Sequence, residues 1–152
     1  MENKRISRAE YFINSALLVS LRSGCERMAV GAVIVADNRI IATGYNGPAK
    51  GLSCKIGQCN PQETCTHAIH AEANAIYFSA KMGIPLKDTI IYCTHSPCKK
   101  CAEAIIQAGI IRVYYLKEYR SMEGSELLKA ANIDCIQIEE PKVKIIANEE
   151  QL

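Results

Sequence analysis

Residues 70–139 alternate between helical and strand-like segments, and this alternation limits the folds open to the chain. Helical patterns end at Gly83 and Gly109, and the segments between helices are short and rich in β-branched and aromatic residues. The predicted order is helix 70–82, strand 89–95, helix 96–108, strand 112–117, helix 125–131 and strand 133–139. Strands joined by helices are typically parallel with right-handed crossovers. The pattern predicts an α/β fold.

The first part of the chain adds a helix and a hairpin. A capping box at Ser7 and Glu10 opens a helix over about residues 9–23, which Gly24 ends. Predicted strands 30–36 and 39–45, a turn at Asp37-Asn38 and a loop over 46–66 follow. The whole pattern predicts a mixed sheet of about five strands with helices on both faces. We expect a single domain over residues 1–152, with no assignment for the charged tail after about residue 140.

Charge and hydropathy disfavour a nucleic-acid-binding protein and a secreted or membrane protein. The formal net charge is +2 without a dense run of Lys or Arg, which disfavours a dedicated nucleic-acid surface. The start of the chain is charged and lacks the apolar core of a signal peptide. The longest apolar run, residues 29–36, is far shorter than the roughly 20 residues of a membrane span. We expect a cytoplasmic protein without a membrane or nucleic-acid partner.

The chain has eight cysteines, an unusual number for such a protein. Without an export signal, metal binding or catalysis explains them better than disulfides, although some can be buried apolar fillers. Cys93 and Cys135 lie in strand-like runs, and we assign both to packing.

Cys98 and Cys101 form the motif SPCKKC, with Ser96 predicted as N-cap and Pro97 as the first helical residue. Their spacing puts both sulfurs on one side of a first helical turn, where the helix N-terminus stabilises thiolates. A thioredoxin-like redox pair has the same spacing, so this motif alone does not identify the chemistry.

The motif His70-Ala-Glu72 separates these alternatives. H-x-E followed by P-C-x-x-C is the signature of zinc-dependent deaminases. In this interpretation His70, Cys98 and Cys101 hold Zn²⁺ and leave its fourth position to water. Glu72, which does not ligate the metal, carries protons during the reaction. Taken singly, His70 could be a core histidine and Glu72 a solvated helix charge; the joint occurrence of both halves favours the deaminase.

The chain resembles the deoxycytidylate (dCMP) deaminase family of the cytidine deaminase-like superfamily. The resemblance rests on CERMAVGAVIV (25–35), TGYNG (43–47), IHAEANAI (69–76), THSPCKKCAEAIIQAGI (94–110) and VYYLKEY (113–119). It implies a three-layer α/β/α sandwich and hydrolysis of dCMP to dUMP and ammonia, which supplies thymidylate synthesis. It also implies a homo-oligomer, a hexamer in many members, activation by dCTP and inhibition by dTTP, with a divalent cation such as Mg²⁺ beside the triphosphate.

The resemblance also implies substrate contacts. It places Asn46 on the substrate sugar, whereas Asn46-Gly is by itself a strong turn signal. Tyr119 matches a recurrent family tyrosine. Candidates for the substrate phosphate are Arg27, Lys50, Tyr119 and Arg120. Lys81 stands where some relatives have an arginine linked to nucleotide control, which weakens the case for regulation.

Four further cysteines predict a second, structural zinc. Cys54, Cys59 and Cys65 lie in one loop and Cys25 precedes the first strand, and four loop thiolates can close a tetrahedral site. Some family members hold a zinc here through cysteines at the positions of Cys25 and Cys54. His67 is an alternative ligand to Cys59 or Cys65, and four free thiols are the alternative to a site.

Two competing functions stay open at this point. A tRNA-editing adenosine deaminase, or another nucleoside or base deaminase, would use the same zinc chemistry but would need a basic surface for phosphates. A zinc-stabilised interaction module would need no proton carrier, so Glu72 argues against it.

Overall fold

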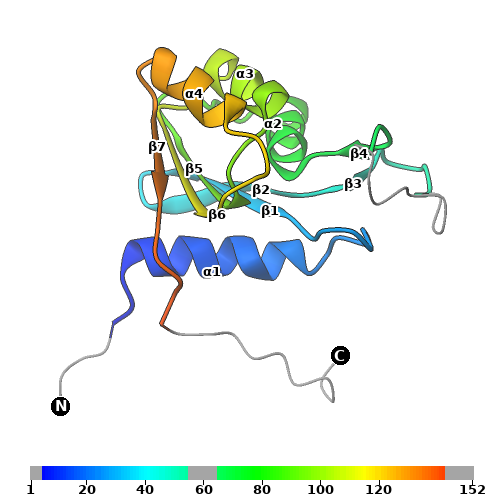
Figure 1. The fold of residues 1–152 in the computed structure, drawn as a ribbon, viewed down its shortest axis with the longest axis horizontal. Coiled ribbons are helices and arrows are strands. Elements are labelled where there is room, and N and C mark those ends of the chain that lie inside the picture. Colours follow the sequence, from blue (N-terminus) through cyan, green and yellow to red (C-terminus); the bar gives the residue numbers. More distant parts are fainter. Residues whose placement is uncertain (1–4, 55–64, 143–152) are drawn as a thin grey trace.

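The computed structural model describes residues 5–54 and 65–142, which form one five-stranded sheet covered by helices on both faces (Figure 1). The strand order is β2-β1-β5-β6-β7. β1 is antiparallel to both β2 and β5, whereas β5, β6 and β7 are parallel. The elements are α1 (Arg8–Ser20), β1 (Gly31–Ala36), β2 (Arg39–Tyr45), β3 (Gly47–Pro48), β4 (Ala68–Ile69), α2 (Ala71–Met82), β5 (Ile90–His95), α3 (Lys99–Gln107), β6 (Arg112–Lys117), α4 (Glu123–Ala130) and β7 (Asp134–Gln137). This confirms the predicted α/β fold with a mixed sheet.

Two apolar clusters, one on each face of the sheet, hold the layers together. α1 alone covers one face, where Phe12, Ile13 and Ala16 pack against Val33 and Val35 of β1. α2, α3 and α4 cover the other face and bury a larger cluster against β1, β5 and β6. The elements that carry the predicted metal ligands therefore share one side of the sheet.

Local signals in the sequence account for several element ends. The Ser7–Glu10 capping box opens α1, since Ser7 Oγ accepts a hydrogen bond from the Glu10 amide and the Glu10 carboxylate accepts one from the Ser7 amide. Asp37 and Asn38 both have positive φ, as a tight type I′ hairpin turn requires. Gly83 ends α2 in the left-handed conformation.

Some predicted bounds are wrong by a few residues. α1 ends at Ser20 rather than Ser23, α4 begins at Glu123 rather than Ser125, and β7 covers only four residues. Within the segment predicted as loop, Gly47–Pro48 forms one strand of a two-stranded ribbon with Ala68–Ile69. Cys93 is fully buried and Cys135 packs against the same cluster, which confirms their assignment to packing.

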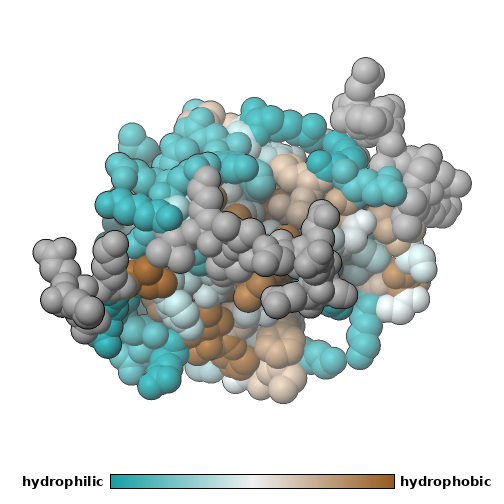
Figure 2. Space-filling view, turned by 90° about the horizontal axis from the view of Figure 1, so that it is seen from below, coloured by the Kyte–Doolittle hydropathy of each residue, from teal (hydrophilic) through white to brown (hydrophobic). Residues whose placement is uncertain are grey.

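The outer surface of the α1 layer mixes polar and apolar side chains (Figure 2). Tyr11, Leu18 and Leu21 are its large exposed apolar residues. The described segment after β7 returns to α1, where the Lys142 amide donates a hydrogen bond to Glu10. Within residues 5–54 and 65–142, no helix is both long and apolar enough to span a membrane.

Candidate active site

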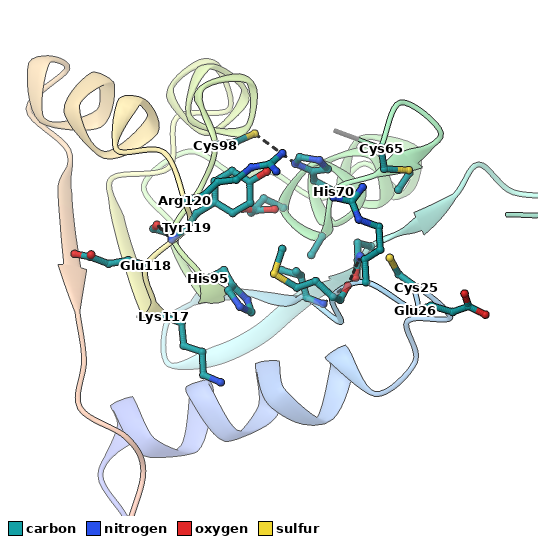
Figure 3. A pocket seen from close by; sticks show the side chains of 18 residues that line it. Cys25, Glu26, Cys65, His70, His95, Cys98, Lys117, Glu118, Tyr119 and Arg120 are labelled. Carbon is teal, nitrogen blue, oxygen red and sulfur yellow. Dashed lines mark hydrogen bonds between the residues drawn. The ribbon is translucent and has the colours of Figure 1, made fainter. Parts of the chain in front are cut away.

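Three predicted metal ligands meet where α2 and α3 begin. His70 is the N-cap of α2, Cys98 is the N-cap of α3, and Cys101 lies in the first turn of α3. The Nδ1 atom of His70 lies 3.4 Å from the Sγ of Cys98, and both side chains are labelled in Figure 3. The same Nδ1 atom lies 3.4 Å from the Sγ of Cys101. The three ligand atoms all lie within 4.8 Å of one another.

This spacing fits a tetrahedral zinc ion. Zn–S bonds of about 2.3 Å and Zn–N bonds of about 2.0–2.1 Å at a tetrahedral angle separate sulfur and nitrogen by about 3.5 Å. The observed separations of 3.4 Å agree with that value. One imidazole and two thiolates are typical zinc ligands, and three protein ligands leave a fourth position open to the cavity.

In the absence of metal, the pKa values of the two thiols shift in opposite directions. The hydrogen bond from the Cys101 thiol, with a further contribution from His70, lowers the pKa of Cys98 to about 4. The same bond and burial raise the pKa of Cys101. The Cys98 thiolate in turn raises the pKa of His70. Metal binding would remove the Cys101 proton, because only thiolates bind zinc.

Glu72 lies beside these ligands and is almost fully buried, with 4% of its surface exposed. Burial is the main cause that raises the pKa of its carboxyl group to about 6, and the charge of Cys98 also raises it. A carboxyl with a pKa near neutrality can both accept and donate a proton at physiological pH. Its position in the first turn of α2 puts it next to Cys101 rather than in solvent.

The backbone at His70 explains how residues 70 and 72 reach one site. Two residues so close do not share a helix face. His70, however, is the N-cap and has an extended backbone, with ψ of 156°. Its side chain is therefore not tied to the helical rotation of Glu72.

The predicted start of α3 is wrong. Cys98, not Ser96, is the N-cap, and Pro97 lies before the helix, fully buried. The Ser96 Oγ instead accepts a hydrogen bond of 2.7 Å from the Tyr119 amide. This bond fixes the loop after β6 to the segment that carries Cys98.

A cavity of about 560 Å³ opens next to His70, Glu72 and Cys98. It is lined by four predicted substrate residues: Arg27, Asn46, Tyr119 and Arg120. Lys50, the remaining phosphate candidate, is exposed and does not line it, and Lys81 is exposed near the end of α2. The cavity also includes His95 and Lys117, which we did not single out from the sequence.

Both polar groups of the Asn46 side chain bond to the segment before β1. Oδ1 accepts a hydrogen bond of 2.8 Å from the Val30 amide, and Nδ2 donates one of 2.8 Å to the Met28 carbonyl. Asn46 thus fixes the position of the segment before β1 in the cavity wall. A primary amide has a second N–H and a second lone pair, which leaves capacity for a ligand.

The predicted second zinc ligands are not assembled among the described residues. Cys25 and Cys65 line the cavity, Cys54 is half-buried, and His67 is exposed. Cys59 lies outside the described residues. Within the described ranges, His70, Cys98 and Cys101 are the one group of three potential ligands close enough for a metal. The backbone amide of His67 is the main cause that lowers the pKa of Cys65.

Comparison with known proteins agrees with this geometry. The profile of a family described as "Cytidine and deoxycytidylate deaminase zinc-binding region" matches residues 6–117. The chain is 44% identical over 139 residues to ComE operon protein 2 of Bacillus subtilis, covering 90% of this chain and 74% of that protein. It is 37% identical over 155 residues to the deoxycytidylate deaminase of Saccharomyces cerevisiae, covering 93% of this chain but only 49% of the yeast enzyme.

A solved structure is similar over nearly its whole length. The dCMP deaminase of the cyanophage S-TIM5, crystallised with dCMP and dUMP, superimposes with a TM-score of 0.79 at 35% identity. The match covers 85% of this chain and 95% of the phage chain.

Proposed function

This chain belongs to the cytidine and deoxycytidylate deaminase family, and we propose that it is a zinc-dependent hydrolase that converts dCMP and water to dUMP and ammonia. One observation carries the proposal: His70 Nδ1 lies 3.4 Å from two cysteine sulfurs, at the wall of a cavity, with Glu72 buried beside them. A purely structural zinc would be expected to have four protein ligands and no adjacent proton carrier.

The chain's own residues divide the chemistry. His70, Cys98 and Cys101 would hold the ion, which when bound supplies the Lewis acidity that makes water a nucleophile at neutral pH. As a carboxylate, Glu72 accepts a proton from the attacking water. As a carboxylic acid, it delivers this proton to the ring nitrogen of cytosine; it then takes the remaining proton of the oxygen that has added to the ring and delivers it to the departing amino group. Its pKa of about 6 suits both roles.

The cavity can accept a nucleotide beside this centre. Its volume of about 560 Å³ is in the usual range of small-molecule sites. We assign the substrate sugar to Asn46 and the phosphate to Arg27, Tyr119 and Arg120, because guanidinium and hydroxyl groups form charge-assisted hydrogen bonds to phosphate. The Arg120 guanidinium lies 5.5 Å from the centre of the Tyr119 ring, so these two side chains form one wall.

Regulation and assembly extend the proposal. We expect dCTP to activate and dTTP to inhibit, with Mg²⁺ accompanying either nucleotide, in a cytoplasmic homo-oligomer, a hexamer as in many relatives. Product dUMP would supply thymidylate synthesis. Lys81, which stands where some relatives have an arginine linked to nucleotide control, is the departure that weighs against regulation. Turnover measured with each triphosphate, and light scattering for mass, test these expectations.

A second, structural zinc also belongs to the proposal, held by Cys25, Cys54 and two of Cys59, Cys65 and His67. Its support is the position of Cys25 and Cys65, which both line the cavity. Metal analysis of the purified protein should give two zinc ions per chain. A value of one would remove the structural site and leave the catalytic one.

The decisive test is a substrate panel with zinc-loaded protein. Ammonia release should be fast from dCMP and much slower from deoxycytidine or tRNA. Better turnover of tRNA would reject dCMP deamination in favour of tRNA editing. Glu72→Ala should abolish turnover and retain zinc, and loss of the metal would show that Glu72 has been misassigned.

A further inference from the structure

His95 is a cavity residue to which the proposed reaction gives no role. It ends β5, three residues before Cys98, and is half-buried in the cavity wall. Figure 3 shows its ring near Lys117, across the cavity from Cys25 and Cys65. A histidine in such a position can act as a ligand, a proton carrier or a hydrogen-bond donor.

The neighbouring Thr94 determines which ring nitrogen carries the proton. The Thr94 hydroxyl oxygen accepts a hydrogen bond of 3.1 Å from the Gly31 amide and lies 3.1 Å from His95 Nδ1. Thr94 is 2% exposed, so its own proton needs an acceptor inside the protein. Among the contacts of the Thr94 hydroxyl within the described residues, His95 Nδ1 is the group that can accept this proton, so we assign Nδ1 as the unprotonated nitrogen and place the ring proton on Nε2.

The surroundings of His95 favour the neutral ring, whereas those of the metal ligand His70 favour the protonated one. Burial is the main cause that lowers the pKa of His95, and the positive charge of Lys117 lowers it further. Lys117 also lines the cavity, as do Tyr119 and Arg120 on the loop that follows it. His95 therefore belongs to the wall that carries cationic and hydroxyl groups.

We propose that His95 is a substrate-binding residue that donates its Nε2–H to the 5′-phosphate of the nucleotide. The inference rests on the proposed function, since it takes a nucleoside monophosphate as the ligand. A phosphate needs several donors, and a neutral N–H held by Thr94 adds one in a fixed direction. Thr94 acts through His95 and is a positioning residue.

Two variants of similar shape distinguish the effect of losing the hydrogen-bond donor from the effect of changing the size of the side chain. His95→Gln keeps a terminal N–H at comparable reach, whereas His95→Met has similar length and no donor. We expect His95→Met to weaken dUMP binding, measured by calorimetry, by about ten- to a hundredfold, the range for losing one hydrogen bond to a charged group. His95→Gln should recover most of the affinity. Deoxyuridine, which lacks the phosphate, should bind wild type and both variants equally.

The kinetic readout on dCMP gives an independent check. His95→Met should raise KM with little change in kcat, and zinc content should stay at the wild-type value. Equal weakening of dUMP by the two variants, equal weakening of deoxyuridine, or a fall in kcat at constant KM would overturn the phosphate contact. If wild type binds dUMP in this manner but does not deaminate dCMP, the proposed reaction fails and the contact stands.

Discussion

Gly124, in the first turn of α4, packs directly against the segment that carries a predicted metal ligand. A Cβ atom at this position would lie 1.9 Å from the Pro97 carbonyl oxygen and 2.8 Å from the Cys98 carbonyl carbon. Cβ atoms essentially never approach closer than 3.0 Å, so the Pro97 oxygen and the α4 backbone would have to separate by a further 1.1 Å, from 1.9 to 3.0 Å. Gly124→Ala should therefore displace Cys98.

The size of this displacement predicts a loss of metal affinity. Zinc–ligand distances in sound sites vary by only about 0.2 Å, several times less than the required movement. We expect zinc affinity to fall by about ten- to a hundredfold, the range found when supporting residues of metal sites are changed. Overpacking should also lower the free energy of unfolding by about 1–3 kcal/mol.

Gly31→Ala is the matched control. Its Cβ would lie 2.1 Å from the Ala16 carbonyl oxygen and 2.7 Å from the Ser20 amide, where α1 packs on the opposite face of the sheet. It should lower the free energy of unfolding to a similar degree and leave zinc affinity unchanged. Competition with a chromophoric chelator measures affinity, and urea unfolding measures stability. Wild-type zinc affinity in Gly124→Ala, or equal loss in both variants, would refute the reasoning.

Three further predictions concern ionisation, capping and the cavity wall. In metal-free protein, Glu72→Gln should raise the free energy of unfolding by up to about 2 kcal/mol at pH 8 and by little at pH 4. The reason is that burial raises the pKa of Glu72 from 4.5 to about 6, so the folded wild-type protein loses stability as the pH rises through that window. Urea unfolding in chelator at both pH values checks this, and a difference independent of pH would contradict it. Ser7→Ala should lower the free energy of unfolding by about 1 kcal/mol, since it removes one half of the capping box, and should leave zinc affinity unchanged. Urea unfolding and chelator competition measure the two quantities. An unchanged urea midpoint would argue against the capping role. Asn46→Ala should lower the free energy of unfolding by about 1–3 kcal/mol, because it removes the hydrogen-bond partners of the Val30 amide and the Met28 carbonyl. It should also reduce dCMP turnover. Wild-type stability of this variant would show that water replaces the side-chain amide.

The parts of the site that the sequence predicts are those carried by short contiguous motifs. H-A-E and S-P-C-x-x-C each lie at one helix start, and their joint occurrence as the zinc deaminase signature is enough to expect His70, Cys98 and Cys101 around one ion. Their mutual distance still depends on how α2 and α3 pack on the sheet, which no motif encodes.

The parts that the sequence does not predict depend on partners far apart in the chain. Nothing local distinguishes His95 from a packing residue, because its tautomer follows from Thr94 and the Gly31 amide, 63 residues before Thr94. The same is true of Ser96: its preference for an N-cap is local, but the hydrogen bond from the Tyr119 amide, 23 residues away, takes its oxygen.

A comparison of the helix starts explains why the site departs from local rules. α1 begins with a complete capping box, whereas neither His70, the N-cap residue of α2, nor Cys98, that of α3, has a side-chain capping hydrogen bond. A good cap stabilises a helix by about 1 kcal/mol, so both helices forgo that contribution. The side chains that would cap them are directed instead toward each other, 3.4 Å apart. Local rules fail at functional positions when another partner replaces the missing interaction, and a bound metal, which stabilises only the folded chain, would do so here.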